Sequence, residues 1–279
     1  MATVAPAPSS PRAGRRTHFR GALLGRTAFW TLFVGIGGSV LLAAMWHDAR
    51  VAVIGSLVTI AGVVIFAYRY ADKKSELEFF VSLAPSLGMS YLGELGVVGI
   101  TPLLAAGDRR HLEYAMSGGG AQLGMYTYEV ERRNSNGNVE RREPYHFTVC
   151  IMDLAANMPS YPGVYLCRKR GLLHGDDWLR RDRSHKVELE SIAFNERYDL
   201  LRESDQDEMA LRELFSPSLV DWLATHPLAP GFELRAGVLV VWLPGHVEDA
   251  GKLSFFLEAA HHLADAVQRQ AQQAAATTV

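Results

Sequence analysis

The fold of this chain is decided by residues 26–70, which read RTAFWTLFVGIGGSVLLAAMWHDARVAVIGSLVTIAGVVIFAYRY. Residues 27–46 contain no charged side chain, and after a short polar break residues 51–68 again contain none. An α-helix rises about 1.5 Å per residue and the hydrocarbon core of a bilayer is about 30 Å thick, so each apolar run is long enough to cross once. The sequence therefore predicts a transmembrane hairpin with spans at 27–46 and 51–69.

Basic residues indicate how this hairpin is oriented. Arginines precede the first span at Arg12, Arg15, Arg16, Arg20 and Arg26, and Arg69, Lys73 and Lys74 accompany the end of the second. The loop between the spans carries Arg50 against Asp48. Because cytoplasmic loops are enriched in Lys and Arg, both termini are predicted to be cytoplasmic at the plasma membrane. A cleaved twin-arginine signal at Arg15-Arg16 is disfavoured, because the apolar run is too long for a signal and a second span follows.

Small residues recur along both predicted spans. They are Gly35, Ser39 and Ala43 in the first span and Gly55, Thr59 and Gly62 in the second. This spacing lets helix backbones approach closely, either within the hairpin or between chains of a homo-oligomer, and both possibilities remain open. The uncharged runs 27–46 and 51–68 contain no Asp, Glu, Lys or Arg, the residues that mark ion and proton pathways, so a transporter or channel within one subunit is disfavoured.

The remaining chain is predicted to hold one soluble domain. Of 279 residues, about 190 to 200 remain outside the hairpin and the ends, enough for one hydrophobic core. The formal net charge of −2 does not indicate a nucleic-acid-binding protein. Cys150 and Cys167 show neither disulfide nor metal-ligand spacing and are predicted to be buried and reduced.

Both ends of the chain are predicted to be disordered. Residues 1–25 are rich in Ala, Pro, Ser and Arg and have few large apolar side chains, and residues 269–279 have nothing to bury. Between the ends, the hairpin at 26–70 is followed by a cytoplasmic α+β domain at 75–268. We expect this domain to be an antiparallel sheet with a long C-terminal helix packed on it.

The first half of this domain shows a helix signal followed by strand patterns. Residues 75–78, Ser-Glu-Leu-Glu, fit a capping box that would begin a new helix. Apolar residues then alternate with a period of two over 123–128 and 145–151, on either side of the turn sequence NSNGN at 134–138. These features predict a long antiparallel hairpin. A further strand is predicted at 164–167.

The second half returns to helical periodicity. Ser204 with Asp207 predicts the cap of one helix, and Ser216-Pro217 predicts an N-cap with proline at the first position of the next. Residues 232–243 predict a terminal hairpin whose second strand is apolar on both faces and therefore central in the sheet. Residues 253–267 place apolar side chains on one helical stripe, as expected of a helix packed on the sheet.

Several motifs of the domain resemble a known family. They are GDRR at 107–110, YTY at 126–128, ESIAFNERY at 190–198, LFSP at 214–217 and GFEL at 231–234. The motifs and their order along the chain resemble those of a family of uncharacterised actinobacterial membrane proteins. That family has two N-terminal spans and a cytoplasmic α+β domain of unknown function. The resemblance implies fold and placement. It supplies no catalytic, cofactor or metal residues.

A few residues of the domain are candidates for catalysis or metal binding. Asp108, Arg109 and His111 would suit an enzyme if they converged in a pocket. Glu188 and Glu190 lie on a predicted strand at 187–192, where alternation directs both toward solvent. His261-His262 are adjacent on a predicted helix, about 100° apart, and cannot chelate one ion together. We therefore predict neither cofactor nor metal.

The most basic region of the domain is the loop 168–186. Its cations are Arg168, Lys169, Arg170, Arg180, Arg181, Arg183 and Lys186, interspersed with aspartates. These cations could contact a protein partner or the anionic head groups of the inner leaflet.

The sequence as a whole favours a membrane-anchored, non-catalytic cytoplasmic module that binds a protein partner or the inner leaflet. The alternatives are a membrane-bound enzyme of unknown reaction and an accessory subunit of a transport or envelope-assembly complex.

Overall fold

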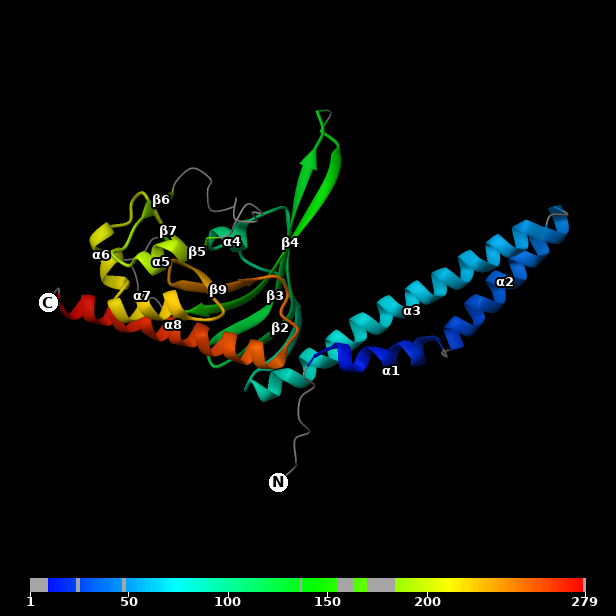
Figure 1. The fold of residues 1–279 in the computed structure, drawn as a ribbon, viewed down its shortest axis with the longest axis horizontal. Helices are drawn as coiled ribbons and strands as arrows, with labels where there is room; N and C mark the ends of the chain where they lie inside the picture. The colour runs from blue at the N-terminus through cyan, green and yellow to red at the C-terminus, as the bar shows by residue number, and fades with distance from the viewer. Residues whose placement is uncertain are drawn as a thin grey trace, which may run out of the picture. The chain divides into compact units, whose positions relative to one another are not determined.

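The computed structural model describes residues 10–23, 26–46, 49–135, 137–154, 163–169 and 184–277. These residues divide into two compact units, Met1–Ser86 with Glu248–Ala250 and Leu87–Val247 with Gly251–Val279. The first unit is helical, and the second is an α+β domain built on a large antiparallel sheet (Figure 1).

The helical unit consists of α1 (Arg12–Leu23), α2 (Arg26–Trp46) and α3 (Ala49–Ser86). α2 and α3 run side by side as a hairpin (Figure 1). Among the described residues, one helical segment, Ala52–Ser86, is long and apolar enough to cross a bilayer by length and composition. The apolar stretch of α2, Ala28–Leu41, is shorter. The structure thus shows one candidate membrane helix, and the span predicted at 27–46 stays a prediction.

α3 differs from the prediction at its C-terminal half. The capping box at 75–78 was expected to begin a new helix, but α3 is continuous to Ser86. The Ser75 hydroxyl donates to the Asp72 carbonyl at 2.8 Å, so it bonds back into the same helix instead of capping a new one. The helix ends beyond Pro85, and Gly88 then takes a left-handed φ of 68°.

α1 differs from the disorder predicted for residues 1–25, but only over Arg12–Leu23, because residues 1–9, 24 and 25 lie outside the described residues. The Arg15 guanidinium pairs with Asp72, and His18 Nε2 lies 2.6 Å from the Glu78 carboxylate. The Phe19 ring packs edge-on against Tyr68, with 6.3 Å between ring centroids. These contacts with α3 fold residues 12–23, although the segment has too few apolar residues to form a core by itself.

The described residues of the second unit form one sheet of nine strands. They are β1 (Ser90–Leu95), β2 (Arg109–Gly118), β3 (Ala121–Arg133), β4 (Val139–Asp153), β5 (Val164–Arg168), β6 (Ser184–Val187), β7 (Tyr198–Glu203), β8 (Gly231–Arg235) and β9 (Val238–Pro244). Their order is β1-β2-β3-β4-β9-β8-β5-β7-β6, and the recorded pairings are antiparallel. The predicted long hairpin is confirmed as β3 and β4. The prediction that the last strand is central is confirmed by β9, which lies between β4 and β8.

In the described connections, four short helices lie between strands: α4 (Pro102–Ala105), α5 (Ile192–Arg197), α6 (Glu208–Leu214) and α7 (Pro217–Thr225). Ser216 caps α7 as predicted, because its hydroxyl accepts the Leu219 N–H. The cap of α6 is Asp207 rather than Ser204. Its carboxylate accepts the Met209 N–H at 3.0 Å.

The strand predicted at 187–192 was too long. β6 ends at Val187, so Glu188 and Glu190 lie in a connection and not on a strand face. Ile192 begins α5 and is 75% exposed. The reason is local, because the Ser191 hydroxyl accepts the Phe194 N–H at 3.3 Å and caps a helix where alternation predicted a strand.

The C-terminal helix α8 (Ala250–Thr277) runs along the sheet, with α7 beside it (Figure 1). Its apolar stripe is buried as predicted: Leu253, Phe256, Leu257, Ala260, Leu263 and Val267. The helix continues to Thr277, past residue 268, where a disordered tail was expected. Residues 269–277 are rich in Ala and Gln, whose high helix propensity extends α8 beyond its buried part. Cys150 and Cys167 are buried and form no disulfide, as predicted.

Candidate functional site

The residues proposed for catalysis do not converge. The Asp108 carboxylate accepts the backbone N–H of Glu131 at 3.2 Å. Arg109 Nε lies 4.0 Å from the Glu129 carboxylate, and the Arg109 side chain is 58% exposed. His111 has a separate neighbour, the Glu113 carboxylate at 3.8 Å. Each side chain is therefore occupied by its own neighbour, and the three share no common target.

His111 instead borders a histidine cluster that sequence reasoning missed. Strand register places His111 opposite Thr127 and Thr127 opposite His146. The Thr127 hydroxyl lies 3.0 Å from His146 Nδ1 and 3.2 Å from Nε2 of His246, which follows β9. Burial, and then the charge of His146, lowers the pKa of His246 to about 4.

This cluster is a polar network on the sheet. Among the described residues, no group of three or more His, Cys, Asp and Glu side chains is arranged to hold a metal ion. No sequence spacing could have revealed the cluster, because His111 and His146 come from different strands and His246 follows a third, so the three meet only in the folded chain.

The basic loop lies largely outside the described residues, including Arg170, Arg180, Arg181 and Arg183. Lys169 follows β5 and Lys186 is in β6, and their ammonium groups lie 3.7 Å and 3.3 Å from the Asp199 carboxylate. Lys186 also lies 3.3 Å from Glu188. Arg168 is exposed at the end of β5. Two of the cations proposed for partner or lipid contact are thus paired with carboxylates of the domain itself.

The small residues predicted to pack within the membrane contact one another in pairs. A Cβ added at Gly35 would overlap the Thr59 side chain, and one added at Gly55 would overlap Ser39. The Ser39 and Thr59 hydroxyls donate back to the carbonyls of Gly35 and Gly55, at 2.7 and 2.9 Å. Those two hydrogen bonds lie within single helices. The close approaches of Gly35 to Thr59 and of Gly55 to Ser39 are the ones that join α2 to α3 within one chain. Gly62 is different, because no atom lies within 4 Å of a Cβ added there.

A pocket of about 390 Å³ lies in the second unit, between the start of α5 and helices α6 and α7. Phe215, Val220 and Pro217 form its apolar part, and Glu190, Arg212 and Asp221 are its charged residues. A site that combines apolar contact with a few placed charges suits a protein side chain or a short peptide segment.

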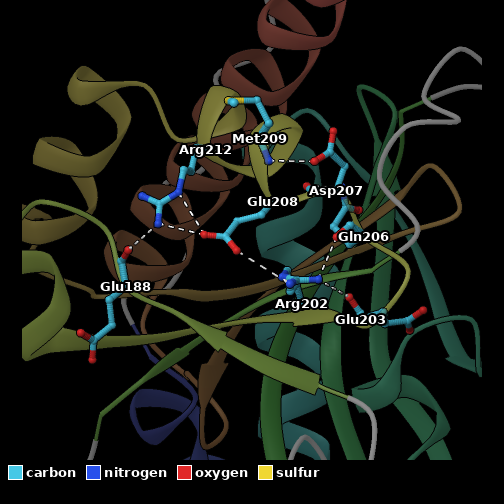
Figure 2. Close-up of polar contacts among 8 residues, drawn as sticks. All are labelled: Glu188, Arg202, Glu203, Gln206, Asp207, Glu208, Met209 and Arg212. Atoms are coloured by element: carbon cyan, nitrogen blue, oxygen red, sulfur yellow. Dashed lines mark hydrogen bonds and ion pairs between the residues drawn. The ribbon is translucent and has the colours of Figure 1, made fainter.

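An ionic network holds Arg212 at this pocket (Figure 2). The Glu208 carboxylate accepts Arg212 Nη2 at 3.0 Å and Nε at 3.2 Å, and its other oxygen lies 3.8 Å from Arg202. Arg202 also donates to the Gln206 carbonyl at 2.9 Å, while Arg212 donates to the Glu188 carbonyl at 3.4 Å. The network ties α6 to β7 and to the 188–191 connection, and so links the elements that form the pocket wall.

Two large apolar side chains lie exposed near this pocket. Ile192 directly follows Ser191, which lines the pocket, and is 75% exposed. Met209 is three residues before Arg212 in α6, on the same side of the helix, and is 67% exposed. We call the surface formed by Glu190, Ile192, Met209, Arg212 and Asp221 the α5–α6 surface.

Comparison with known proteins gives one point of similarity. No family model and no curated protein matches the chain. Among solved structures, the chain is similar to the crystal structure of the mycobacterial trehalose monomycolate transport factor A, TtfA. The TM-score is 0.48 and the sequence identity 14%, over 70% of this chain and 95% of that chain. No residue role in this chain follows from that likeness.

Proposed function

We propose that this chain is a membrane-anchored, non-catalytic module whose α+β domain binds a protein partner through the α5–α6 surface at the cytoplasmic face of the plasma membrane. The proposal has two parts, the anchor and the binding surface, which rest on different residues.

The anchor is supported by apolar side chains exposed along α2 and α3. Phe33 is 64% exposed in α2, and Leu57 and Phe66 are 62% and 67% exposed in α3. The most apolar 18-residue stretch of Ala52–Ser86 is 11% buried within the protein. A core helix of a soluble domain would be mostly buried, so this helix is of a different kind. Contiguous apolar surface of this kind is stable in hydrocarbon and unfavourable in water. Arginines before α2 favour a cytoplasmic N-terminus, and two crossings return the domain to that side.

The binding surface is supported by one observation: Ile192 and Met209 are exposed beside a preformed pocket that presents Arg212 between carboxylates. Interfaces are enriched in Met, aromatic residues and Arg, and their binding energy is concentrated at a few apolar anchors. A partner segment that places an apolar side chain against Ile192 and Met209, and a cation near Glu190 and Asp221, complements this surface.

A protein partner is favoured over the anionic inner leaflet. Lys169 and Lys186 already face Asp199, so a lipid phosphate would have to compete with that carboxylate. Glu190 and Asp221 on the α5–α6 surface would repel anionic head groups. If the loop 168–186 instead bound the leaflet, the α+β domain should bind anionic vesicles. Charge reversal at Arg180, Arg181 and Arg183 should then remove most of this binding.

A more specific form of the proposal is an accessory subunit of a transport or envelope-assembly complex. A domain tethered by a short membrane hairpin can reach partners that lie close to the same membrane, and the tether raises their effective concentration. Co-purification of a membrane protein in mild detergent supports this form. Recovery of the chain alone as a monomer counts against it.

Site-specific crosslinking in cells tests the binding surface. A photo-activatable residue at Ile192 or at Met209 should give a covalent adduct of one defined mass. Met209→Glu should reduce the adduct formed from position 192, and Ile192→Glu should reduce the adduct formed from position 209. Val139 on β4, 40% exposed, is the control position and should give no such adduct. Equal adducts at Val139, or no adduct at either test position, contradict the proposed surface.

A further inference from the structure

A cavity of about 910 Å³ lies within the helical unit, where α1 approaches α2 and α3. α1 contributes His18, Gly21 and Ala22, and α2 contributes Ala28 and Thr31. The longest wall belongs to α3: Thr59, Gly62, Val63, Phe66, Ala67, Tyr70 and Lys74. None of these residues takes part in the α5–α6 surface.

The wall formed by α3 has the length of a lipid chain. Its residues recur every three or four positions and therefore share one helix face. From Thr59 to Lys74 the helix rises about 22 Å, at about 1.5 Å per residue. An extended acyl chain that reaches from the head-group region toward the middle of a bilayer spans a similar distance, since the whole hydrocarbon core is about 30 Å thick.

The polarity of the cavity changes along its length. Lys74, Tyr70 and His18 supply polar groups at one end, whereas Val63, Phe66 and Ala67 make the adjoining wall apolar. Lys74 lies beyond the apolar run of α3, on the side predicted to be cytoplasmic. An occupant must therefore have a polar head at the leaflet surface and an apolar chain directed into the membrane.

The charges at the polar end suit an anionic head group. Glu78 contacts both His18 and Lys74, and its contact with His18 is shorter, 2.6 Å against 4.0 Å from the Lys74 ammonium. The Lys74 side chain is 45% exposed. A phosphate of an anionic lipid would compete with Glu78 for Lys74, but this 4.0 Å contact is longer than those of Lys169 and Lys186 with Asp199, and the contact between His18 and Glu78 need not be displaced.

We infer that this cavity binds one anionic phospholipid, with an acyl chain along α3 from Thr59 to Tyr70 and the phosphate at Lys74. The inference rests on the proposed anchor, because the lipid enters from the bilayer. A lipid held in this way would fill the space between α1 and the hairpin, and would make the contact of α1 with α3 depend on the lipid composition of the membrane.

Glycines provide a matched pair of test variants. Gly62 lies in the cavity wall, and outside the neighbouring backbone of α3 nothing lies within 4 Å of a Cβ added there, so a leucine at this position would project into open space. Gly37 in α2 is equally open but is not part of the cavity wall, so Gly37→Leu is the control. Lys74→Glu tests the head-group end separately.

The experiment is native mass spectrometry of the full chain, released from micelles that contain phosphatidylglycerol or phosphatidylcholine with the same acyl chains. We expect one retained phosphatidylglycerol per chain and weaker retention of phosphatidylcholine. Gly62→Leu should reduce retention of phosphatidylglycerol about tenfold, and Gly37→Leu should leave it unchanged. Lys74→Glu should reduce it about fivefold and remove the preference over phosphatidylcholine.

Extraction of the chain from membranes separates the two possible failures. If alkaline carbonate releases the protein without detergent, the anchor itself is wrong. If the protein stays in the membrane but Gly62→Leu and Gly37→Leu retain phosphatidylglycerol equally, the lipid site is wrong and the anchor stands. Equal retention of the two lipids by the unaltered chain also overturns the inference.

Discussion

The carboxylate of Glu233 accepts the backbone N–H of Leu103 through both oxygens, at 2.9 and 3.1 Å, although 130 positions separate the two residues. Glu233 lies on β8 with no exposed surface, and Leu103 belongs to α4 in the connection between β1 and β2. From the neighbouring strand β3, the Tyr126 hydroxyl donates to the Leu103 carbonyl at 3.1 Å. A buried polar group is costly unless it is hydrogen-bonded, so this contact fixes α4 against the sheet.

Replacing Glu233 should therefore destabilise the domain. Glu233→Ala leaves the Leu103 N–H buried without its acceptor, and we expect the free energy of unfolding to fall by about 1.5 to 3 kcal/mol. Glu213→Ala, at an exposed position in α6, is the matched control. Urea titration of both variants measures the difference. Equal midpoints would show that the Glu233 contact contributes nothing.

The histidine cluster should make stability depend on pH. Burial lowers the pKa of His246 to about 4 from its ordinary value of 6.5, so in this window the unfolded chain binds more protons than the folded chain. Stability is then complete above about pH 6.5 and falls as the pH drops toward 4.

His246→Gln should flatten this dependence between pH 6.5 and pH 4. His185→Gln, at an exposed position in β6, should leave it unchanged. Thermal unfolding across the pH series is the measurement. The same slope in His246→Gln and in the unaltered chain would assign the pH dependence to other groups.

The packing of α2 on α3 should be sensitive to Gly35. A side chain there overlaps Thr59, whereas Gly37 has open space around it. Gly35→Leu should lower the unfolding temperature of the detergent-solubilised protein, and Gly37→Leu should not, because only the first forces the two helices apart. Indistinguishable unfolding temperatures would mean that this close contact is not maintained in the membrane-embedded chain.

The proposed topology places both termini in the cytoplasm. A reporter that is active only in the periplasm should be silent when fused after Val279 and active when inserted between Asp48 and Ala49. The arginines before α2 and the near-neutral loop between the helices are the physical reason. Strong activity after Val279 would reverse the orientation and remove the cytoplasmic placement of the α5–α6 surface.

The buried stripe of α8 should carry much of the stability of the domain. Leu263 has no exposed surface, so Leu263→Ala should cost about 2 to 5 kcal/mol through lost apolar contact and the cavity left behind. Met209→Ala, at a side chain that is 67% exposed, is a control of similar chemistry and should cost much less. A small effect at Leu263 would mean that α8 is not an integral part of the core.

Features with a local cause were predictable from the sequence. The alternation in 123–151 and its Asn-Gly turn produced the hairpin of β3 and β4, and Ser216-Pro217 marked the start of α7. The apolar stripe at 253–267 marked the buried face of α8. Each is encoded within a few residues, since strand and helix periods and caps involve near neighbours.

Other features were decided only by tertiary structure. α1 is held by contacts of Arg15 with Asp72 and of His18 with Glu78 in α3. α3 continues through Ser75, although the sequence around Ser75 fits the start of a helix. Ile192 has the apolar character of a strand residue, but the cap at Ser191 makes it the exposed start of α5.

The candidate site belongs almost wholly to this second group. Arg212 becomes a pocket residue because Glu208 and the Glu188 carbonyl hold it. Two strand registers bring His111 and His146 opposite Thr127, and His246 joins them through its contact with the Thr127 hydroxyl. Glu233 meets Leu103 across the sheet. The sequence by itself determined the membrane-anchor pattern, the strand and helix periods and the net charge. Tertiary structure decided which polar groups meet, because hydrogen bonds and ion pairs act over a few ångströms between residues that only the folded chain brings together.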